Sequence, residues 1–232
     1  MKKNLLRNAL AAIVVATAAT LASCGGKNPA SQVDDIVGEA EKNVAEEASP
    51  CLGSIPSLQM QYSEAQKLLD EKMKQRGEEA EQKFKDGGSM EDVFREVKKM
   101  KDEKKTLQHE LNRIYTERIM AEAKKLEGKS VECEVDGRRF SKAVVKLVCS
   151  KDSSTTSPLI VEAELTLKAP YRGLVGYCSW QYRDANGHEL SSGASPVDDS
   201  GKYKAGDTIR QSFPLAVTQE KAKSLAKIYF TE

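Results

Sequence analysis

The feature that most constrains the fold is a change in the spacing of the apolar residues at Gly128. Before this glycine, apolar residues recur at steps of three and four, and charged residues are concentrated in this half. After it, β-branched and aromatic residues alternate with polar ones, which is typical of strands. Two periods in two separate halves predict helices followed by a sheet. We therefore expect an α+β fold.

The first half predicts two long helices. Residues 57–85 contain no proline and carry apolar residues at helical spacing, so they form an amphipathic helix. Asp86-Gly87-Gly88 ends this helix, and Ser89 is placed to cap a second one, which runs to about residue 127. Helices joined by so short a connection are usually antiparallel neighbours. We expect a helical hairpin with coiled-coil-like packing.

The second helix carries a heptad seam, with apolar residues at alternating steps of four and three. Lys104 and Arg118 interrupt the seam, which favours an antiparallel hairpin over a long parallel dimer. A second apolar face leaves a weak dimer open, so we expect a monomer or a weak dimer through the helices. The seam is Val93, Val97, Met100, Leu107, Leu111, Ile114 and Ala121, and the second face is Tyr115, Ile119 and Leu126.

The second half predicts seven or eight short strands, a number typical of a two-sheet sandwich. Pro214 lies in one of them and marks an edge or bulged strand, because proline cannot donate a ladder hydrogen bond. Turns are predicted at 136–137 and 184–187, loops at 151–158 and 192–205, and a helical turn capped by Thr218 at 219–224. The predicted strands are 131–135, 140–149, 159–168, 174–182, 188–191, 208–217 and 225–230.

The N-terminus has the pattern of an export signal. Lys2, Lys3 and Arg7 precede an apolar run over 9–21, which is too short for a typical spanning helix. The run ends in Leu21-Ala22-Ser23-Cys24, which resembles the lipobox of bacterial lipoproteins. The resemblance implies cleavage before Cys24 and attachment of acyl chains such as palmitate to this residue. Two or three chains would anchor the protein stably.

The residues after Cys24 bear on localisation. A glycine follows the cysteine where an aspartate would signal inner-membrane retention, so the resemblance implies an outer-membrane protein. Surface-exported lipoproteins of the Bacteroidota carry an acidic cluster directly after the cysteine, whereas Asp34 and Asp35 come later here. We expect a lipid-anchored protein that faces the periplasm. A flexible spacer and a weak helix over 31–47 follow the cysteine.

The last 75 or so residues resemble the immunoglobulin-like sandwich modules of exported bacterial lipoproteins, of the FxLYD type. The resemblance rests on the stretches 165–168, 180–187, 204–208 and 222–228, which are turn and edge features. It implies an immunoglobulin-like β-sandwich and no catalytic residues. We therefore divide the chain into a signal peptide (1–23), a lipidated spacer (24–56), a helical hairpin (57–127) and the sandwich (128–232).

Four cysteines remain once Cys24 is assigned to lipid, an even number that suits disulfides in an exported protein. A bridge from Cys133 to Cys149 or from Cys149 to Cys178 is one hypothesis, with Cys51 as a further candidate. Buried free thiols are the other hypothesis. The thiols form no C-x-x-C pair, which disfavours thiol catalysis.

The remaining polar residues give no catalytic or metal motif. His109 and His188, the two histidines, lie in different predicted regions, which disfavours a zinc site or a triad. Asp184, Asn186 and Glu189 have a spacing like the start of a calcium loop, but a hairpin turn explains them better. Asp198 and Asp199 would join them only if their loop folded back. We expect no cofactor and no enzymatic activity.

Charge excludes a broad nucleic-acid surface. Without Lys2, Lys3 and Arg7 the chain has 33 of its 36 basic residues against 35 acidic ones. The lysine-rich run 98–105 could contact anionic headgroups or polymers, but interspersed acidic residues favour a solvated helix face. The leading hypothesis is a membrane-anchored, non-enzymatic lipoprotein of the cell envelope that binds or scaffolds another envelope protein. The alternative is a carrier that holds a small ligand or calcium in the sandwich loops.

Overall fold

A computed structural model describes residues 29–151, 155–171, 176–198 and 200–231. The chain divides into two compact units. We call residues 29–44 and 61–114 the helical unit, and the described parts of 45–60 and 115–232 the sheet unit. Each unit is therefore built from segments that are far apart in the sequence.

Within the described residues, three helices precede the strands. Helix α2 spans Pro29–Asn43, α3 spans Ile55–Lys85 and α4 spans Met90–Leu126. The predicted cap is confirmed, since the backbone N–H of Asp92 donates to Ser89 Oγ at 3.2 Å. In the turn before it, Gly87 has a φ of 100°, which a glycine adopts without a steric penalty.

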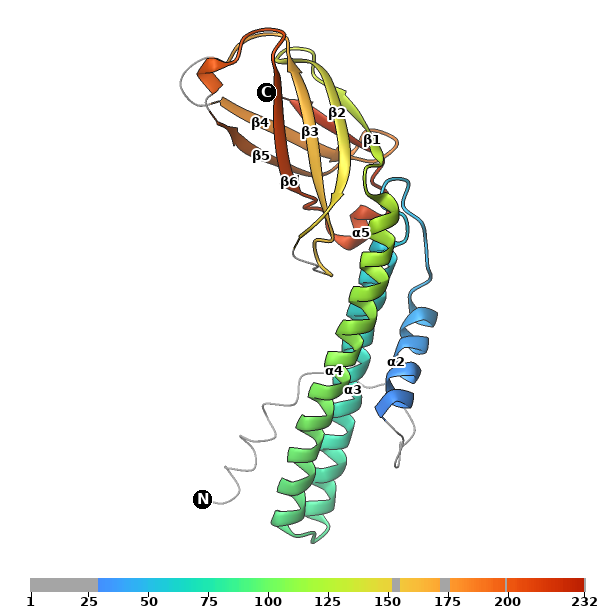
Figure 1. The fold of residues 1–232 in the computed structure, drawn as a ribbon. Coiled ribbons are helices and arrows are strands. Elements are labelled where there is room, and N and C mark those ends of the chain that lie inside the picture. The colour runs from blue at the N-terminus through green and yellow to red at the C-terminus, as the bar shows by residue number, and fades with distance from the viewer. Residues whose placement is uncertain (1–28, 152–154, 172–175, 199, 232) are drawn as a thin grey trace. The chain divides into compact units, whose positions relative to one another are not determined.

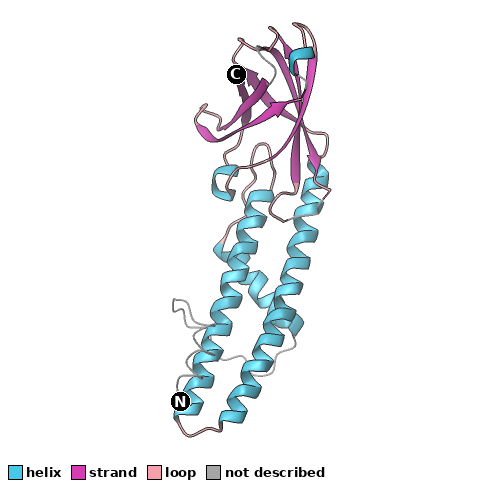
Figure 2. Cartoon of the chain, turned by 90° about the vertical axis from the view of Figure 1, so that its left-hand side faces the viewer, coloured by secondary structure: helices cyan, strands magenta, loops and turns pink. Residues whose placement is uncertain are grey.

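Within the helical unit, α3 and α4 are antiparallel neighbours (Figure 2). The Tyr62 hydroxyl donates to Asn112 Oδ1 at 3.3 Å, and Lys104 Nζ lies 2.7 Å from Asp70 Oδ1. Residues early in α3 therefore lie beside residues late in α4, as expected for antiparallel helices. Helix α2 adds a third apolar stripe to this unit, and its buried residues include Val33, Ile36, Val37 and Ala40.

The buried face of α4 rotates around the helix. Up to Leu107 the buried residues lie seven apart, and from Leu107 to Ala123 they lie four apart. Because a step of four residues exceeds one helical turn by about 40°, repeated steps of four carry the stripe to a different side. The buried residues are Val93, Met100, Leu107, Leu111, Tyr115, Ile119, Ala123 and Leu126.

This rotation corrects the predicted seam. Ile114 is only partly buried and Ala121 is exposed, whereas the seam would bury both. The face assigned to a weak dimer is instead covered by the chain itself, with Tyr115 and Ile119 at 0% exposure and Leu126 at 6%. Those three residues therefore offer no dimer surface. The oligomeric state stays a prediction.

The sheet unit contains seven strands in the order β5-β4-β7-β1-β2-β3-β6. All neighbours are antiparallel except β1 and β7, which are parallel. Strand β6, which ends at Pro214, lies at an edge as the proline predicted. The strands are β1 (Ser130–Val135), β2 (Phe140–Cys149), β3 (Leu159–Leu167), β4 (Gly176–Arg183), β5 (Glu189–Val197), β6 (Thr208–Pro214) and β7 (Lys227–Thr231).

Strand β1 joins two halves of this sheet. Its first residues, Ser130 and Val131, pair with β2, and residues 132–135 pair with β7. At the opposite side Ser195 Oγ of β5 donates to Gln211 Oε1 of β6 at 2.8 Å, so the two edge strands approach each other and the sheet is nearly closed. The mixed α+β class is confirmed. The strands form one continuous, curved sheet (Figure 1).

Aromatic side chains fill the concave side of the sheet. The rings of Trp180 on β4 and Phe213 on β6 stack with centroids 3.9 Å apart, and Phe230 on β7 meets Phe213 edge-on at 6.3 Å. Opposite Trp180 in the ladder lies Gly193, where an added Cβ would be 2.6 Å from the indole ring. The glycine makes room for the tryptophan.

Several predicted boundaries in the sheet are wrong. Residues 192–197 belong to β5 and not to a loop, because they pair with β4 although the sequence there is small and polar. Apolar residues occur on both faces of the predicted strand 159–168, but β3 buries one face only. Helix α5 (Gln219–Ala222) forms where predicted, but the Thr218 side chain makes no capping hydrogen bond.

The segment before α3 packs within the sheet unit. Ser49 Oγ donates to the Ala222 carbonyl at 3.0 Å, and Cys51 Sγ donates to the Ala226 carbonyl at 3.0 Å. Lys223 Nζ lies 2.9 Å from Glu47 Oε2. These contacts group residues 45–60 with the sheet, although the sequence places them in the spacer next to the helices.

Candidate functional surfaces

The proposed lipidation residue, Cys24, and the lipobox before it lie outside the described residues. Lipidation therefore stays a prediction. Among residues 29–151, 155–171, 176–198 and 200–231, no helix has the length and apolar character to cross a membrane.

The four other cysteines are free thiols. Cys133 Sγ on β1 donates to the Ala143 carbonyl of β2 at 3.3 Å. Cys149 lies six residues beyond Ala143 on β2, which corresponds to about 20 Å at the rise of a β-strand. A disulfide requires the two Cα atoms to lie within about 7 Å. The strand register therefore does not bring Cys133 and Cys149 together.

The buried thiols are in their neutral form. Burial raises the pKa of Cys178 to about 12, and burial also raises the pKa of Cys51. The Cys51 thiol donates a hydrogen bond to the Ala226 carbonyl, so its polar hydrogen has a partner in the buried position. Since the thiolate is the reactive form of cysteine, both residues act as apolar core side chains at neutral pH.

The turn 184–187 is organised by the Asp184 carboxylate. Its Oδ1 accepts the backbone N–H groups of Asn186 and His188 at 2.8 and 2.9 Å, and Oδ2 lies 3.0 Å from His188 Nδ1. The hydrogen bond from the His188 backbone is the main reason that the pKa of Asp184 lies below its ordinary value. Both oxygens are thus engaged within the predicted turn, in which Gly187 has a positive φ of 86°.

The described residues do not supply a set of ligands for the alternative hypothesis, in which the sandwich loops bind calcium. Within the part of the chain that the structure describes, no group of three or more His, Cys, Asp or Glu side chains could hold a metal ion. Asp199 and residues 152–154 of the other loop lie outside that part, and Asp198 is exposed. His109 is also exposed, with its ring 3.9 Å from Glu110.

The convex face of strands β5, β4 and β7 is the first candidate surface. Cys178, Trp180 and Tyr182 point into the sheet interior, so the odd-numbered residues of β4 point outward. Tyr177 among them is 57% exposed and lies opposite Pro196 of β5. We call the outward residues of these strands the tyrosine face: Tyr177, Ser179, Gln181, Arg183, Ser192, Ala194, Pro196 and Tyr229.

Part of the tyrosine face is held in one arrangement. The Arg183 guanidinium lies 3.8 Å from the centre of the Tyr229 ring, and its Nε donates to Gln181 Oε1 at 3.0 Å. A guanidinium stacked on an aromatic ring keeps hydrogen-bond donors free to meet a partner. The face thus combines an exposed aromatic ring with ordered polar groups.

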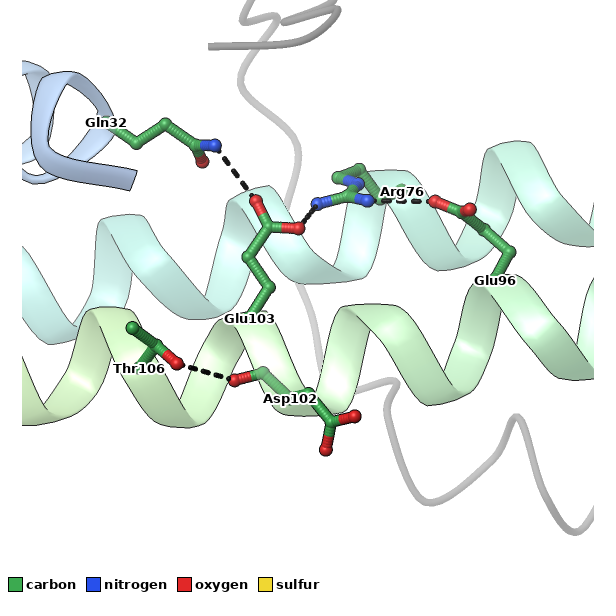
Figure 3. Close-up of polar contacts among 6 residues, drawn as sticks. All are labelled: Gln32, Arg76, Glu96, Asp102, Glu103 and Thr106. Atoms are coloured by element: carbon green, nitrogen blue, oxygen red, sulfur yellow. Dashed lines mark hydrogen bonds and ion pairs between the residues drawn. The ribbon is translucent and has the colours of Figure 1, made fainter. Parts of the chain in front are cut away.

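A charged cluster in the helical unit is the second feature (Figure 3). Arg76 of α3 contacts two carboxylates of α4, with Nη1 2.6 Å from Glu103 and Nη2 2.8 Å from Glu96. Gln32 of α2 donates to the other oxygen of Glu103 at 2.9 Å. The cluster thereby ties all three helices together.

The cluster sets the ionisation of Glu103. Partial burial opposes the charged form, but the hydrogen bonds from Arg76 and Gln32 outweigh it and hold the pKa of this carboxyl below its ordinary value. The same contacts raise the pKa of Arg76 against the opposing effect of burial. Paired charges of this kind position helices, and we assign them no catalytic role.

Sequence reasoning missed both features. Tyr177 was expected in the strand 174–182, but which face of that strand is buried depends on the closure of the sheet. Arg76 and the two glutamates, Glu96 and Glu103, carry opposite charges on two predicted antiparallel helices. Their pairing could have been inferred only from the register of the hairpin. The register itself was not predicted from the sequence.

Comparison with known proteins identifies no relative: no family model, no curated protein and no solved structure matches this chain.

Proposed function

We propose that this chain is a membrane-anchored, non-enzymatic lipoprotein of the bacterial cell envelope that binds a protein partner through the tyrosine face. The observation that carries the binding proposal is Tyr177, 57% exposed on an otherwise ordered sheet face. Aromatic residues and arginine are enriched at the centres of protein interfaces, because they bury much area at a small entropic cost.

The finer architecture belongs to this proposal. We describe the sheet unit as an immunoglobulin-like, sandwich-type recognition module and the helical hairpin as a coiled-coil-like element. The divided pairing of β1 supports the first, because it separates β2-β3-β6 from β7-β4-β5, and the Trp180–Phe213 stack joins the two halves. The antiparallel contacts between α3 and α4 support the second.

The non-enzymatic assignment is supported by how the chemically versatile side chains are used. Cys51 and Cys178 are buried in neutral form, and both oxygens of Asp184 are bound within its own turn. These groups serve the fold. A lipid tether at Cys24, facing the periplasm from the outer membrane, is the localisation that the proposal adopts.

Site-specific photocrosslinking tests the binding proposal. A photoreactive phenylalanine analogue replaces Tyr177 in the full-length chain, and the same analogue at Lys142, exposed on β2, is the matched control. We expect a discrete crosslinked protein after irradiation of intact cells from position 177 and not from 142. Equal crosslinking from both positions would count against the tyrosine face.

The anchor is tested separately by changing Cys24 to Ala. We expect loss of acyl-chain labelling and release of the protein from the membrane fraction. A variant with Cys51→Ala is the control, since this thiol is buried in the folded protein. If the Cys24 variant still carries labelled acyl chains, the anchor proposal is wrong.

A further inference from the structure

The outer face of α4 carries a row of lysines next to an exposed aromatic ring. Phe94, Lys98, Lys101 and Lys105 follow one another at steps of four, three and four. At about 100° per residue these steps keep all four side chains within about 60° of one another. All four are exposed, and Phe94 is 53% exposed. We call them the lysine face.

The lysine face lies opposite the buried stripe of the helical unit. Val93, Met100 and Leu107 are buried at 6%, 3% and 0% exposure. Measured from the middle of the lysine face, these positions are displaced by about 110 to 150° around the helix. The lysine face is therefore directed away from the packed side of α4.

The acidic residues interspersed in the run do not neutralise this face. The carboxylates of Glu96 and Glu103 both contact Arg76 of α3, so they are turned toward the helix interface (Figure 3). Asp102 is exposed and its side chain points away from the cluster. Residues 98–105 thus contain four exposed lysines, at 98, 99, 101 and 105, and one exposed carboxylate, that of Asp102.

The lysines of the face are not used in the fold. Among the described residues, Lys98, Lys101 and Lys105 make no ion pair, whereas the neighbouring Lys104 pairs with Asp70 at 2.7 Å. At the start of the helix Arg95 lies 3.6 Å from Glu91 and 3.5 Å from Asp92, so it offsets one of these two negative charges. The positive field of the face is therefore open to an external anion.

We infer that the lysine face docks on an anionic lipid surface. Lysines near such a surface contribute about 1 kcal/mol each by electrostatic attraction. An aromatic ring among them gains further free energy by entering the region between headgroups and acyl chains. A dissolved anionic polymer would offer charge but no apolar phase for Phe94, so the combination favours lipid. The inference does not depend on a lipid anchor at Cys24.

Vesicle sedimentation tests the inference with the chain from residue 25 onward, which keeps every described residue and lacks the anchor. The probes are vesicles of phosphatidylcholine alone and vesicles that also contain phosphatidylglycerol. We expect binding to the second kind only, and loss of binding near 1 M salt, where charges are screened within about 3 Å. No binding to phosphatidylglycerol vesicles would overturn the inference.

Two matched variants locate the surface. Replacing Lys98, Lys101 and Lys105 by Gln should lower the partition coefficient roughly a hundredfold. Replacing Lys142, Lys146 and Lys151 of the sheet unit by Gln removes the same charge from other exposed positions and should have a much smaller effect. Equal losses would show that only net charge matters, and the lysine face would be excluded.

A substitution of Phe94 distinguishes lipid from anionic polymer. Phe94→Ala should weaken binding to the anionic vesicles. Phe94→Trp should preserve binding, and the emission of the introduced indole should shift to shorter wavelength when the protein binds. If Phe94→Ala binds as well as the parent chain and a dissolved anionic polysaccharide competes fully, the partner is a polymer and the lipid assignment is wrong.

Discussion

The interior of the sheet and the interface between α3 and α4 are built on different principles. Inside the sheet, Trp180, Phe213 and Phe230 form one aromatic cluster. Between the helices, apolar residues alternate with charged ones, and Arg76 contacts both Glu96 and Glu103. A curved sheet encloses a volume from which water is excluded, whereas two helices meet along a narrow stripe with wet margins.

This difference predicts where stability comes from. Burying a large apolar side chain contributes about 1.5 to 3 kcal/mol, and a partly exposed ion pair contributes about 0 to 1 kcal/mol. Single substitutions in the sheet interior should therefore be far more damaging than substitutions in the charged cluster.

Cys178 tests whether the sheet interior excludes solvent. With a pKa of about 12, its thiolate population at neutral pH is on the order of a thousandfold below that of an ordinary cysteine. Alkylation of Cys178 in native protein, followed by peptide mass spectrometry, should be slower by at least that factor than in denaturant. The control is Cys149, which is only partly buried. Similar rates for the two residues would refute a closed interior.

The same labelling decides the state of the thiols. In denaturant without reductant, all four cysteines outside the N-terminal segment should react, because all four are free in the fold. If Cys149 labels only after reduction, a disulfide is present and the strand register near it is different.

Phe230→Ala should cost the sheet about 3 to 5 kcal/mol of unfolding free energy, because it leaves a cavity against Phe213. Urea unfolding followed by the fluorescence of Trp180, the single tryptophan of the chain, measures this loss. Tyr177→Ala on the outward face is the control and should change stability by no more than about 0.5 kcal/mol. A loss below about 1 kcal/mol for Phe230→Ala would contradict the cluster.

Gly193→Ala should destabilise the sheet by about 1 to 3 kcal/mol. The new methyl group would lie 2.6 Å from the indole ring of Trp180, so the ring has to move. A shift in the emission maximum of Trp180 should accompany the loss. Ser192→Ala, exposed on the same strand, is the control and should leave both quantities unchanged.

The charged cluster should give the smallest effect. A double-mutant cycle with Arg76→Met and Glu103→Gln should yield a coupling energy of about 1 kcal/mol or less, measured by far-UV circular dichroism during unfolding. A parallel cycle on the exposed pair Arg95 and Glu91 should yield none. A coupling of several kcal/mol would mean that the helix interface is as dry as the sheet interior.

The pH dependence of that coupling has a defined sign. The pKa of Glu103 is lower in the folded chain than in the unfolded one. Its contribution is therefore fully present above the ordinary carboxyl range and is lost as the pH falls through the depressed folded value. Repeating the cycle in acid should abolish the coupling, and a coupling that grew in acid would contradict the assignment.

Much of the local structure was predictable. Helices α3 and α4 and the strands β1, β2 and β3 lie within a few residues of their predicted bounds, because helical spacing, alternation and turn residues are local signals. The turn at Gly87 and the Ser89 cap were predicted for the same reason. The start of β5 was predicted too, but its continuation over 192–197 was not, since that stretch lacks apolar alternation and its pairing with β4 determines it.

The candidate surfaces were harder to predict. The sequence showed the lysine run 98–105 but not the use of Glu96 and Glu103, which depends on Arg76 in another helix. It showed Tyr177 in a strand but not which side of that strand faces solvent. Both outcomes require the pairing of segments that are distant in the chain.

The order of helices and strands, the hairpin turn and the resemblance of the N-terminus to a lipoprotein signal follow from local sequence patterns. The near closure of the sheet, the rotation of the buried face along α4 and the separation of Cys133 from Cys149 depend on the tertiary structure. The physical reason is range. Propensity, capping and turn chemistry act over a few residues, whereas strand register and the packed face of a helix depend on contacts between distant segments.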